Sequence, residues 1–314
     1  MRRAYLLAPL MLLLLAGPAH AGGPQVVASI KPLHSLVAGV TEGVTEPELL
    51  LDAGDSPHTY AMRPSEARAV RGADLVVYVS PHMEAFLERA LEARGDPGSV
   101  LAAAELDGVS LLPAREIQVE EGDTDPDHDA GDDHHHGPHE HDYHIWLDPE
   151  NARAIVAALA ERLAEIDPEH AETYADNAAA LDERLQALDA RLRERLEPVQ
   201  DRAYIVFHDA YQHFERRYGL KAAGAVTINP DQPPGARHLS QLRSRIGELD
   251  AACVLSEPQF EPAIVRSLTR GLDIRSGELD PLGAGLEPGP DAYFELLEGL
   301  AEDLRACLLA EGDG

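Results

Sequence analysis

The chain has 314 residues, of which 44% are hydrophobic and 26% are charged, as is usual for a soluble globular protein. It carries 26 basic and 56 acidic residues, a formal charge of −30, and its only lysines are Lys31 and Lys221. This balance argues against a protein that binds nucleic acid or docks on anionic lipid, because both tasks need basic surface. It favours cations as ligands.

Residues 1–21 are typical of a secretory signal peptide. Arg2 and Arg3 precede a 13-residue apolar run, 4–16, which is too short to span a bilayer comfortably. Ala19 and Ala21 place small residues where a signal peptidase cuts. We expect export to the periplasm as a soluble protein without a lipid anchor, because no cysteine follows the run. An uncleaved membrane anchor is the alternative.

Short apolar runs then alternate with helical patterns. We expect strands over 25–30, 47–51, 74–80 and 99–103, and helices over 33–40, 65–71 and 83–94. Apolar strands that alternate with helices predict a mostly parallel sheet that is covered on both faces.

Residues 120–142 interrupt this pattern with ten acidic residues, six histidines and almost nothing apolar. A segment of this composition cannot pack, so we expect a mobile surface loop. Imidazoles and carboxylates suit zinc, copper or nickel, but a flexible loop loses entropy on coordination, so we expect weak binding without one geometry. The loop histidines are His128, His134, His135, His136, His139 and His141.

The chain beyond the loop predicts a helix from Pro149 to Glu165, a long helix over 168–198 and a second α/β half over 199–314. One apolar stripe follows the long helix, so we expect a spine of ~45 Å that packs on both halves. The stripe consists of Tyr174, Ala178, Leu181, Leu185, Leu188, Leu192 and Leu196. In the second half we expect strands over 203–207, 222–228, 253–256 and 273–279, and helices over 210–218, 238–249, 262–271 and 291–309. The predicted fold is therefore α/β, with Rossmann-like lobes over 22–167 and 199–314 joined by one long helix.

The two cysteines, Cys253 and Cys307, predict a disulfide in an exported protein. It would pin the last helix to a strand of the second half and stabilise the fold by about 4 kcal/mol in the chain-entropy model. Thiolate metal ligation is the alternative, although no second cysteine pair at metal-ligand spacing accompanies them.

Three histidines lie at strand-to-helix junctions: His58, His144 and His208. Because ligands of parallel sheets collect outside the carboxyl ends of the strands, we expect these side chains to converge between the lobes. Asp280 occupies a similar junction and is a candidate fourth ligand, with a turn or capping aspartate as the equal alternative.

Several long motifs resemble those of the ZnuA-type zinc-binding branch of the cluster A-I (cluster 9) family, the solute-binding proteins of bacterial ABC transporters. The motifs are GDSPHTYAMRPSEARAVRGADLVVYVSPHMEAFL, DYHIWLDPENA, FHDAYQHFERRYGL, LSEPQFEP and GELDPLG. The resemblance covers essentially the whole mature chain. It implies two α/β lobes joined by one helix, Zn²⁺ in the cleft between them, and delivery of zinc to a membrane permease with a cytoplasmic ATPase. We also expect the protein to be a monomer.

The resemblance also assigns the ligands. The three family histidines fall on His58, His144 and His208, and the family carboxylate falls on Asp280. Some members carry glutamate before the first histidine, whereas this chain has Pro57, so Asp280 or a water is the fourth ligand. Manganese-binding relatives carry a carboxylate at the third position, where this chain has His208, and three imidazoles suit zinc better.

Two other functions fit the same residues. An exported zinc hydrolase would use the three histidines with an open metal position and Glu257 as its base, but the chain has no H-E-x-x-H motif. A passive metal buffer or chaperone would bind zinc without a transporter. The primary prediction is a zinc carrier that is not an enzyme.

Overall fold

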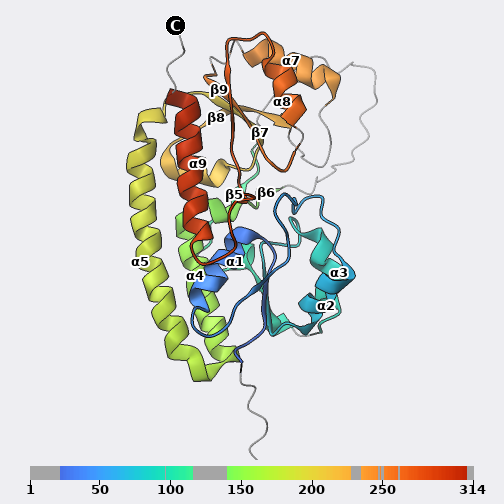
Figure 1. Ribbon diagram of the computed structural model, residues 1–314, viewed down its shortest axis with the longest axis vertical. Helices are drawn as coiled ribbons and strands as arrows, with labels where there is room; N and C mark the ends of the chain where they lie inside the picture. The colour runs from blue at the N-terminus through green and yellow to red at the C-terminus, as the bar shows by residue number, and fades with distance from the viewer. Residues whose placement is uncertain are drawn as a thin grey trace, which may run out of the picture.

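The structure is a computed structural model that describes residues 22–95, 97–115, 140–227, 235–246, 248, 251–260 and 262–309. Within these ranges the chain forms two four-stranded parallel sheets, each flanked by helices (Figure 1). We call the sheet nearer the N-terminus and its helices the N-lobe, and the other sheet and its helices the C-lobe. The predicted signal peptide lies outside the described residues, and among the described helices none has the length and apolar character needed to cross a membrane.

The N-lobe sheet has the strand order β2-β1-β3-β4. Its strands are β1 (Val26–Ala28), β2 (Glu48–Leu49), β3 (Leu75–Tyr78) and β4 (Val100–Ala102). Its helices are α1 (Lys31–Val40), α2 (Pro64–Gly72) and α3 (Glu88–Glu92), and 3-10 turns cover 85–87, 97–99 and 103–105. Because β1 and β3 are buried on both faces, they appear in the sequence as continuous apolar runs.

One predicted helix of the N-lobe is broken. The helix expected over 83–94 is a 3-10 turn followed by the short α3. The cause lies at Glu84, whose carboxylate turns back into the lobe and accepts hydrogen bonds from the backbone N–H groups of Val79 (2.7 Å) and Ser80 (3.0 Å). These hydrogen bonds hold Glu84 in a non-helical backbone conformation, so a regular helix cannot run through it.

Part of the segment predicted as a loop, 120–142, forms a strand. Residues 120–139 lie outside the described part of the chain, but His141–Asp142 form strand β6, which pairs antiparallel with β5 (Leu112–Pro113). Asp142 is buried, because its carboxylate has hydrogen-bond partners that the acidic composition of the segment did not reveal. The two strands form a small ribbon between the lobes (Figure 1).

The spine is helix α5 (Ala171–Leu196), which follows α4 (Pro149–Ile166) and a 3-10 turn over 168–170. Six of the seven residues of the predicted stripe are buried, and only Ala178 is partly exposed. Pro198 falls in the 3-10 turn over 197–199 that ends the helix. The C-terminal helix α9 (Ala292–Leu309) lies beside α5 and also packs on α1, so two helices connect the lobes by packing (Figure 1).

The C-lobe sheet has the strand order β10-β9-β7-β8. Its strands are β7 (Tyr204–His208), β8 (Ala222–Thr227), β9 (Cys253–Ser256) and β10 (Arg275–Glu278). Its helices are α6 (Gln212–Tyr218), α7 (Ala236–Ile246) and α8 (Pro262–Thr269). Alternate residues of β7 face different layers: Tyr204 and Val206 join the main core, whereas Ile205 and Phe207 form a second, smaller core under α7 and α8.

The predicted disulfide is confirmed. Cys253 of β9 and Cys307 of α9 are bonded, with their Cα atoms 5.9 Å apart. Gly277 of β10 lies against this bond, and a Cβ atom there would come within 3.1 Å of the Cys307 Sγ. Glycine at this position therefore lets the edge strand and the closing helix approach each other.

Candidate metal centre

Three histidines from distant parts of the chain meet where the lobes face each other. His58 lies in the turn between β2 and α2, His144 precedes the 3-10 turn over 145–147, and His208 is the last residue of β7. His144 and His208 are buried, whereas His58 is partly exposed. Two histidines of the group thus come from the N-lobe side and one from the C-lobe.

The spacing of the rings fits one small cation. Each histidine offers a ring nitrogen, and these three atoms lie within 4.8 Å of one another. The Nε2 atoms of His144 and His208 are 3.3 Å apart. Two nitrogens at zinc's bond length of ~2.0–2.1 Å and at a tetrahedral angle would be separated by about 3.3 Å. The pair is therefore set at the spacing that a tetrahedral zinc ion requires.

Two buried carboxylates orient these rings. Asp142 Oδ1 lies 2.7 Å from His144 Nδ1, and Glu257 Oε1 lies 2.7 Å from His208 Nδ1. Each carboxylate also accepts a hydrogen bond from the backbone N–H of its histidine. A neutral imidazole that donates from Nδ1 keeps its lone pair on Nε2, so in their neutral forms both rings can offer Nε2 to a metal ion.

The carboxylates also determine the electrostatics of the centre. Burial raises the pKa of Asp142 above its usual value. Burial on its own would lower the pKa of His208, but the adjacent Glu257 carboxylate outweighs it and the pKa of His208 is raised. Negative charge behind the imidazoles increases their basicity and so their strength as metal ligands.

Apolar and aromatic side chains line the rest of the site. Trp146 lies 5.2 Å from the ring of His144, and Phe260 lies 5.7 Å from the ring of His208, measured between ring centroids. On the outer side the three histidines line a pocket together with His82, Met83, Arg115 and Tyr143, among others. A partly apolar wall limits water around the centre and strengthens its interaction with charge.

Asp280 lies outside the group of three histidines. Its carboxylate instead accepts hydrogen bonds from the Gln259 side chain (2.8 Å) and from the backbone N–H groups of Leu282 and Gly283 (3.0 Å each). It also accepts one from the N–H of Ala284. These contacts shape the turn after β10, so the role of Asp280 as a metal ligand stays a prediction.

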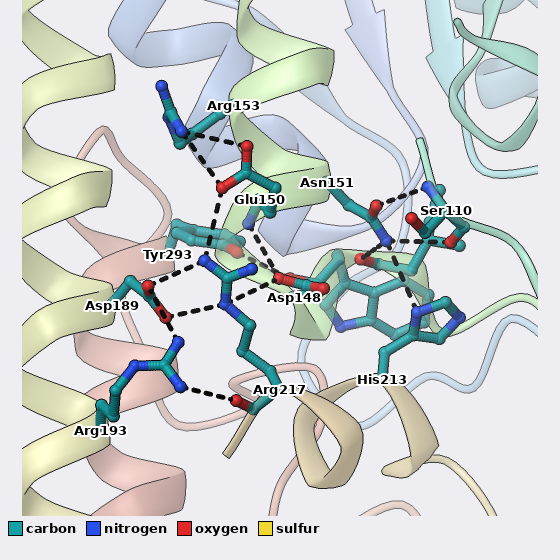
Figure 2. Close-up of polar contacts among 12 residues, drawn as sticks. Ser110, Asp148, Glu150, Asn151, Arg153, Asp189, Arg193, His213, Arg217 and Tyr293 are labelled. Carbon is teal, nitrogen blue, oxygen red and sulfur yellow. Dashed lines mark hydrogen bonds and ion pairs between the residues drawn. The ribbon is translucent and has the colours of Figure 1, made fainter. Parts of the chain in front are cut away.

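The other histidines have different surroundings. His213 is buried on α6 and contacts the carbonyl of Asp142 (2.9 Å) and the amide of Asn151 (3.5 Å), as Figure 2 shows for Asn151. His82 stacks on Tyr143 at the margin of the pocket, 5.2 Å between ring centroids. Of the predicted loop ligands, His141 lies in β6 with its ring 6.3 Å from that of Tyr143. The other five lie outside the described residues: His128, His134, His135, His136 and His139.

Sequence reasoning missed two of the groups that build the centre. Asp142 was assigned to the acidic loop, and Arg115, which lines the pocket, was not singled out. Asp142 could have been found from the sequence, because a carboxylate two residues before a candidate metal-binding histidine can reach its ring. Glu257 was weighed only as a hydrolytic base.

Two α/β lobes along one long helix, with three imidazoles between them, define a two-lobed solute-binding protein with a metal site in the cleft. The chain belongs to the family described as "Zinc-uptake complex component A periplasmic", whose model matches residues 26–307. The resemblance drawn from the sequence motifs is thus confirmed.

Comparisons with individual proteins agree. A high-affinity zinc uptake system protein ZnuA from Brucella abortus (strain 2308) is 42% identical over 309 residues, which cover 90% of this chain and 91% of that protein. One of the same name from Yersinia pestis is 39% identical over 304 residues, with 94% and 95% covered. A crystal structure of ZnuA matches the fold with a TM-score of 0.75 at 23% identity, over 91% of this chain and 99% of the other.

Proposed function

We propose that this protein captures Zn²⁺ between its lobes and delivers it to an ABC-type importer. The observation that carries the proposal is the group of three ring nitrogens within 4.8 Å, contributed by His58, His144 and His208. Imidazole nitrogens suit zinc, and three of them with one further position are the ligand set that zinc takes in an exchangeable site. A carrier needs such a site, because it must also release its cargo.

We propose water as the fourth ligand, since the Asp280 carboxylate already receives hydrogen bonds from the turn that it shapes. Coordination by Asp280 would require that turn to give up several of these bonds. Water also leaves a position through which the ion can be exchanged.

The proposed partner is a membrane permease with a cytoplasmic ATPase, and the proposed location is the periplasm. The support comes from the relatives, which are named as zinc uptake system proteins, and from the description of the family as a periplasmic component of a zinc-uptake complex. We further propose that the carrier acts as a monomer, with lobes corresponding to 22–167 and 199–314 and a linker over 168–198.

The position of Glu257 speaks against the rival hydrolase. Its Oε1 atom faces His208 Nδ1, on the side of the ring away from the other histidines, and supports the imidazole. A general base must instead reach a water on the open side of the metal. The geometry therefore favours binding over hydrolysis.

Calorimetry and chelator competition test the proposal. The protein should bind one zinc ion tightly, and His208→Ala should weaken it more than 100-fold, beyond the 10- to 100-fold effect usual for an outer-shell partner. His170→Ala, which removes a partly exposed imidazole from the turn between α4 and α5, should leave affinity unchanged. Deletion of 120–139 should also leave the tight site. Loss of that site on deletion would show that the primary ligands lie in the deleted segment.

Growth distinguishes a carrier from a buffer. Under zinc limitation the protein should restore growth only where an intact permease is present. Equal rescue without the permease would contradict delivery while leaving zinc binding intact.

A further inference from the structure

The ribbon of β5 and β6 rests on helix α6, although the ribbon precedes the spine in the chain and α6 follows it. The Gln212 side chain donates a hydrogen bond to the carbonyl of Pro113 (2.9 Å), and the His213 ring donates one to the carbonyl of Asp142 (2.9 Å). The ribbon leads directly into His144. One metal-binding segment of the N-lobe side is therefore docked on the C-lobe.

Arg115, at the end of the ribbon, makes the strongest of these contacts. Its guanidinium binds both oxygens of Asp209, with Nε at 3.1 and 3.0 Å and a terminal nitrogen at 2.6 Å. Its other terminal nitrogen lies 2.6 Å from Glu215 Oε2. Glu215 is almost wholly buried, and its Oε1 atom accepts a hydrogen bond from the Tyr204 hydroxyl (2.8 Å). The two-pronged contact with Asp209 fixes the geometry of the guanidinium, and the contact with the buried Glu215 pairs its charge.

These partners lie next to the metal-binding residues in the chain. Asp209 directly follows His208, and Asp142, the partner of His144, pairs with Leu112 in the ribbon that ends at Arg115. The contact between Arg115 and Asp209 therefore ties the segment that holds His144 to the segment that holds His208. Within the described residues, Arg115 is also part of the pocket wall beside these two rings.

We propose that Arg115 is a positioning residue for zinc, which holds His144 and His208 at their 3.3 Å spacing by fixing the ribbon to the β7–α6 junction. This inference rests on the proposed zinc-carrier function. An arrangement held in place before the ion arrives binds more tightly, because binding no longer has to order it. Arg115 thereby also slows zinc release, because neither imidazole can move away from the ion independently of the other.

The effect should appear mainly in the rate of zinc release, as is usual when a binding site is loosened without loss of a direct ligand. We expect Arg115→Gln to bind one zinc ion about 10-fold more weakly and to release it about 10-fold faster, the lower end of the range for outer-shell changes. Arg115→Lys keeps the positive charge but loses the two-pronged guanidinium contact, so its zinc affinity should lie between those of wild type and Arg115→Gln.

Arg217 provides a matched control. It lies on α6, the helix that also carries Glu215, but it makes different contacts from those of Arg115. It too is mostly buried, and it joins α6 to Asp189 of α5 (2.9 and 2.8 Å) and to Glu150 at the start of α4 (3.3 Å) (Figure 2). It connects the lobes at the spine and does not line the metal pocket. Arg217→Gln should lower thermal stability but leave the rate of zinc release unchanged.

The experiment measures zinc release into a fluorescent chelator by stopped flow, and the visible spectrum of the Co²⁺-loaded protein. It uses the full mature chain with Arg115→Gln, Arg115→Lys, Asp209→Asn and Arg217→Gln. We expect faster release and a changed Co²⁺ spectrum with Arg115→Gln and Asp209→Asn, an intermediate result with Arg115→Lys, and no change with Arg217→Gln. If Arg115→Gln does not fold, Asp209→Asn tests the same contact while the Arg115–Glu215 pair remains.

The outcomes separate the two proposals. Wild-type protein without tight one-to-one zinc binding would overturn the proposed function. Wild-type protein with such binding, but with release and spectrum unchanged in Arg115→Gln and Asp209→Asn, would overturn only the positioning role. If Arg217→Gln accelerated zinc release equally, the positioning role of Arg115 would also be overturned, because loss of any contact between the lobes would then have the same effect.

Discussion

The two lobes are built on the same four-stranded parallel sheet but differ in how the sheet is covered. In the N-lobe, the buried residues on both faces of β1 and β3 belong to the main core, which continues through the spine. In the C-lobe, one face joins that core, whereas the other forms the second core of eight buried residues under α7 and α8. The N-lobe and spine should therefore unfold as one unit, and the outer layer of the C-lobe should open more easily.

The disulfide offsets this difference. It links β9 of the C-lobe to α9, which packs on α1 and α5, so the weaker lobe is tied covalently to the stronger core. The centre needs His208 and Glu257 to hold their places at the carboxyl ends of β7 and β9. The C-lobe, whose second core is small, therefore gains more stability from the disulfide than the N-lobe would.

Removal of the disulfide should have the largest effect on stability. We expect Cys253→Ser with Cys307→Ser to lower the free energy of unfolding in urea by about 4 kcal/mol, because the unfolded chain is no longer closed into a loop. Hydrogen exchange should rise most in β9, β10 and the end of α9, while zinc stoichiometry stays at one. A loss below about 1 kcal/mol, or one spread evenly over both lobes, would contradict the comparison of the lobes.

A pair of leucine truncations sharpens the comparison. Leu188 of the spine and Leu242 of α7 are both fully buried, the first in the main core and the second in the second core. Each change to alanine should cost about 3 kcal/mol locally, from lost burial and the cavity left behind. Leu188→Ala should lower the midpoint of global unfolding.

Leu242→Ala should instead raise hydrogen exchange in α7 and α8 while the N-lobe amides keep their protection. The two variants serve as controls for each other, because the residue type and burial are the same. Identical exchange patterns would mean that the two cores unfold together.

The sequence was sufficient to predict the lobes, because buried parallel strands appear as continuous apolar runs and the spine shows a regular stripe. It also predicted that His58, His144 and His208 would converge, and they do. The reasoning from parallel strands holds for His208 at the end of β7, whereas His144 follows β6 of the antiparallel ribbon. Both predictions depend on local patterns that have a fixed spatial meaning.

The groups behind the imidazoles could not be predicted with the same ease. The contact of Arg115 with Asp209 joins residues 94 positions apart, and no local pattern marks either one. Asp142 was hidden in an acidic run, where composition indicates a solvated loop. The sequence could not tell a metal-binding Asp280 from one that shapes a turn, because both roles use the same carboxylate. The backbone N–H groups that bind it come together only in the folded turn.

Each lobe also buries a glutamate at the carboxyl end of its sheet, and the two glutamates have different roles. Glu257 contacts the His208 ring in the C-lobe, whereas Glu84 caps the backbone at the end of β3 in the N-lobe. Burial raises the pKa of Glu84 to about 7 from an ordinary value of 4.5. Between these values the folded protein keeps a proton that the unfolded chain has lost.

The contribution of Glu84 to stability should therefore be fully present below pH 4.5 and should be lost as the pH rises through about 7. Within this window the slope is at most about 1.4 kcal/mol per pH unit. Glu84→Gln, which can still accept the backbone hydrogen bonds, should remove this slope from urea unfolding curves and be more stable than wild type at pH 8. Glu88→Gln removes an exposed carboxylate from the same segment and controls for net charge. If Glu84→Gln and Glu88→Gln change the pH profile equally, the effect comes from overall charge and not from the buried carboxyl that closes the N-lobe sheet.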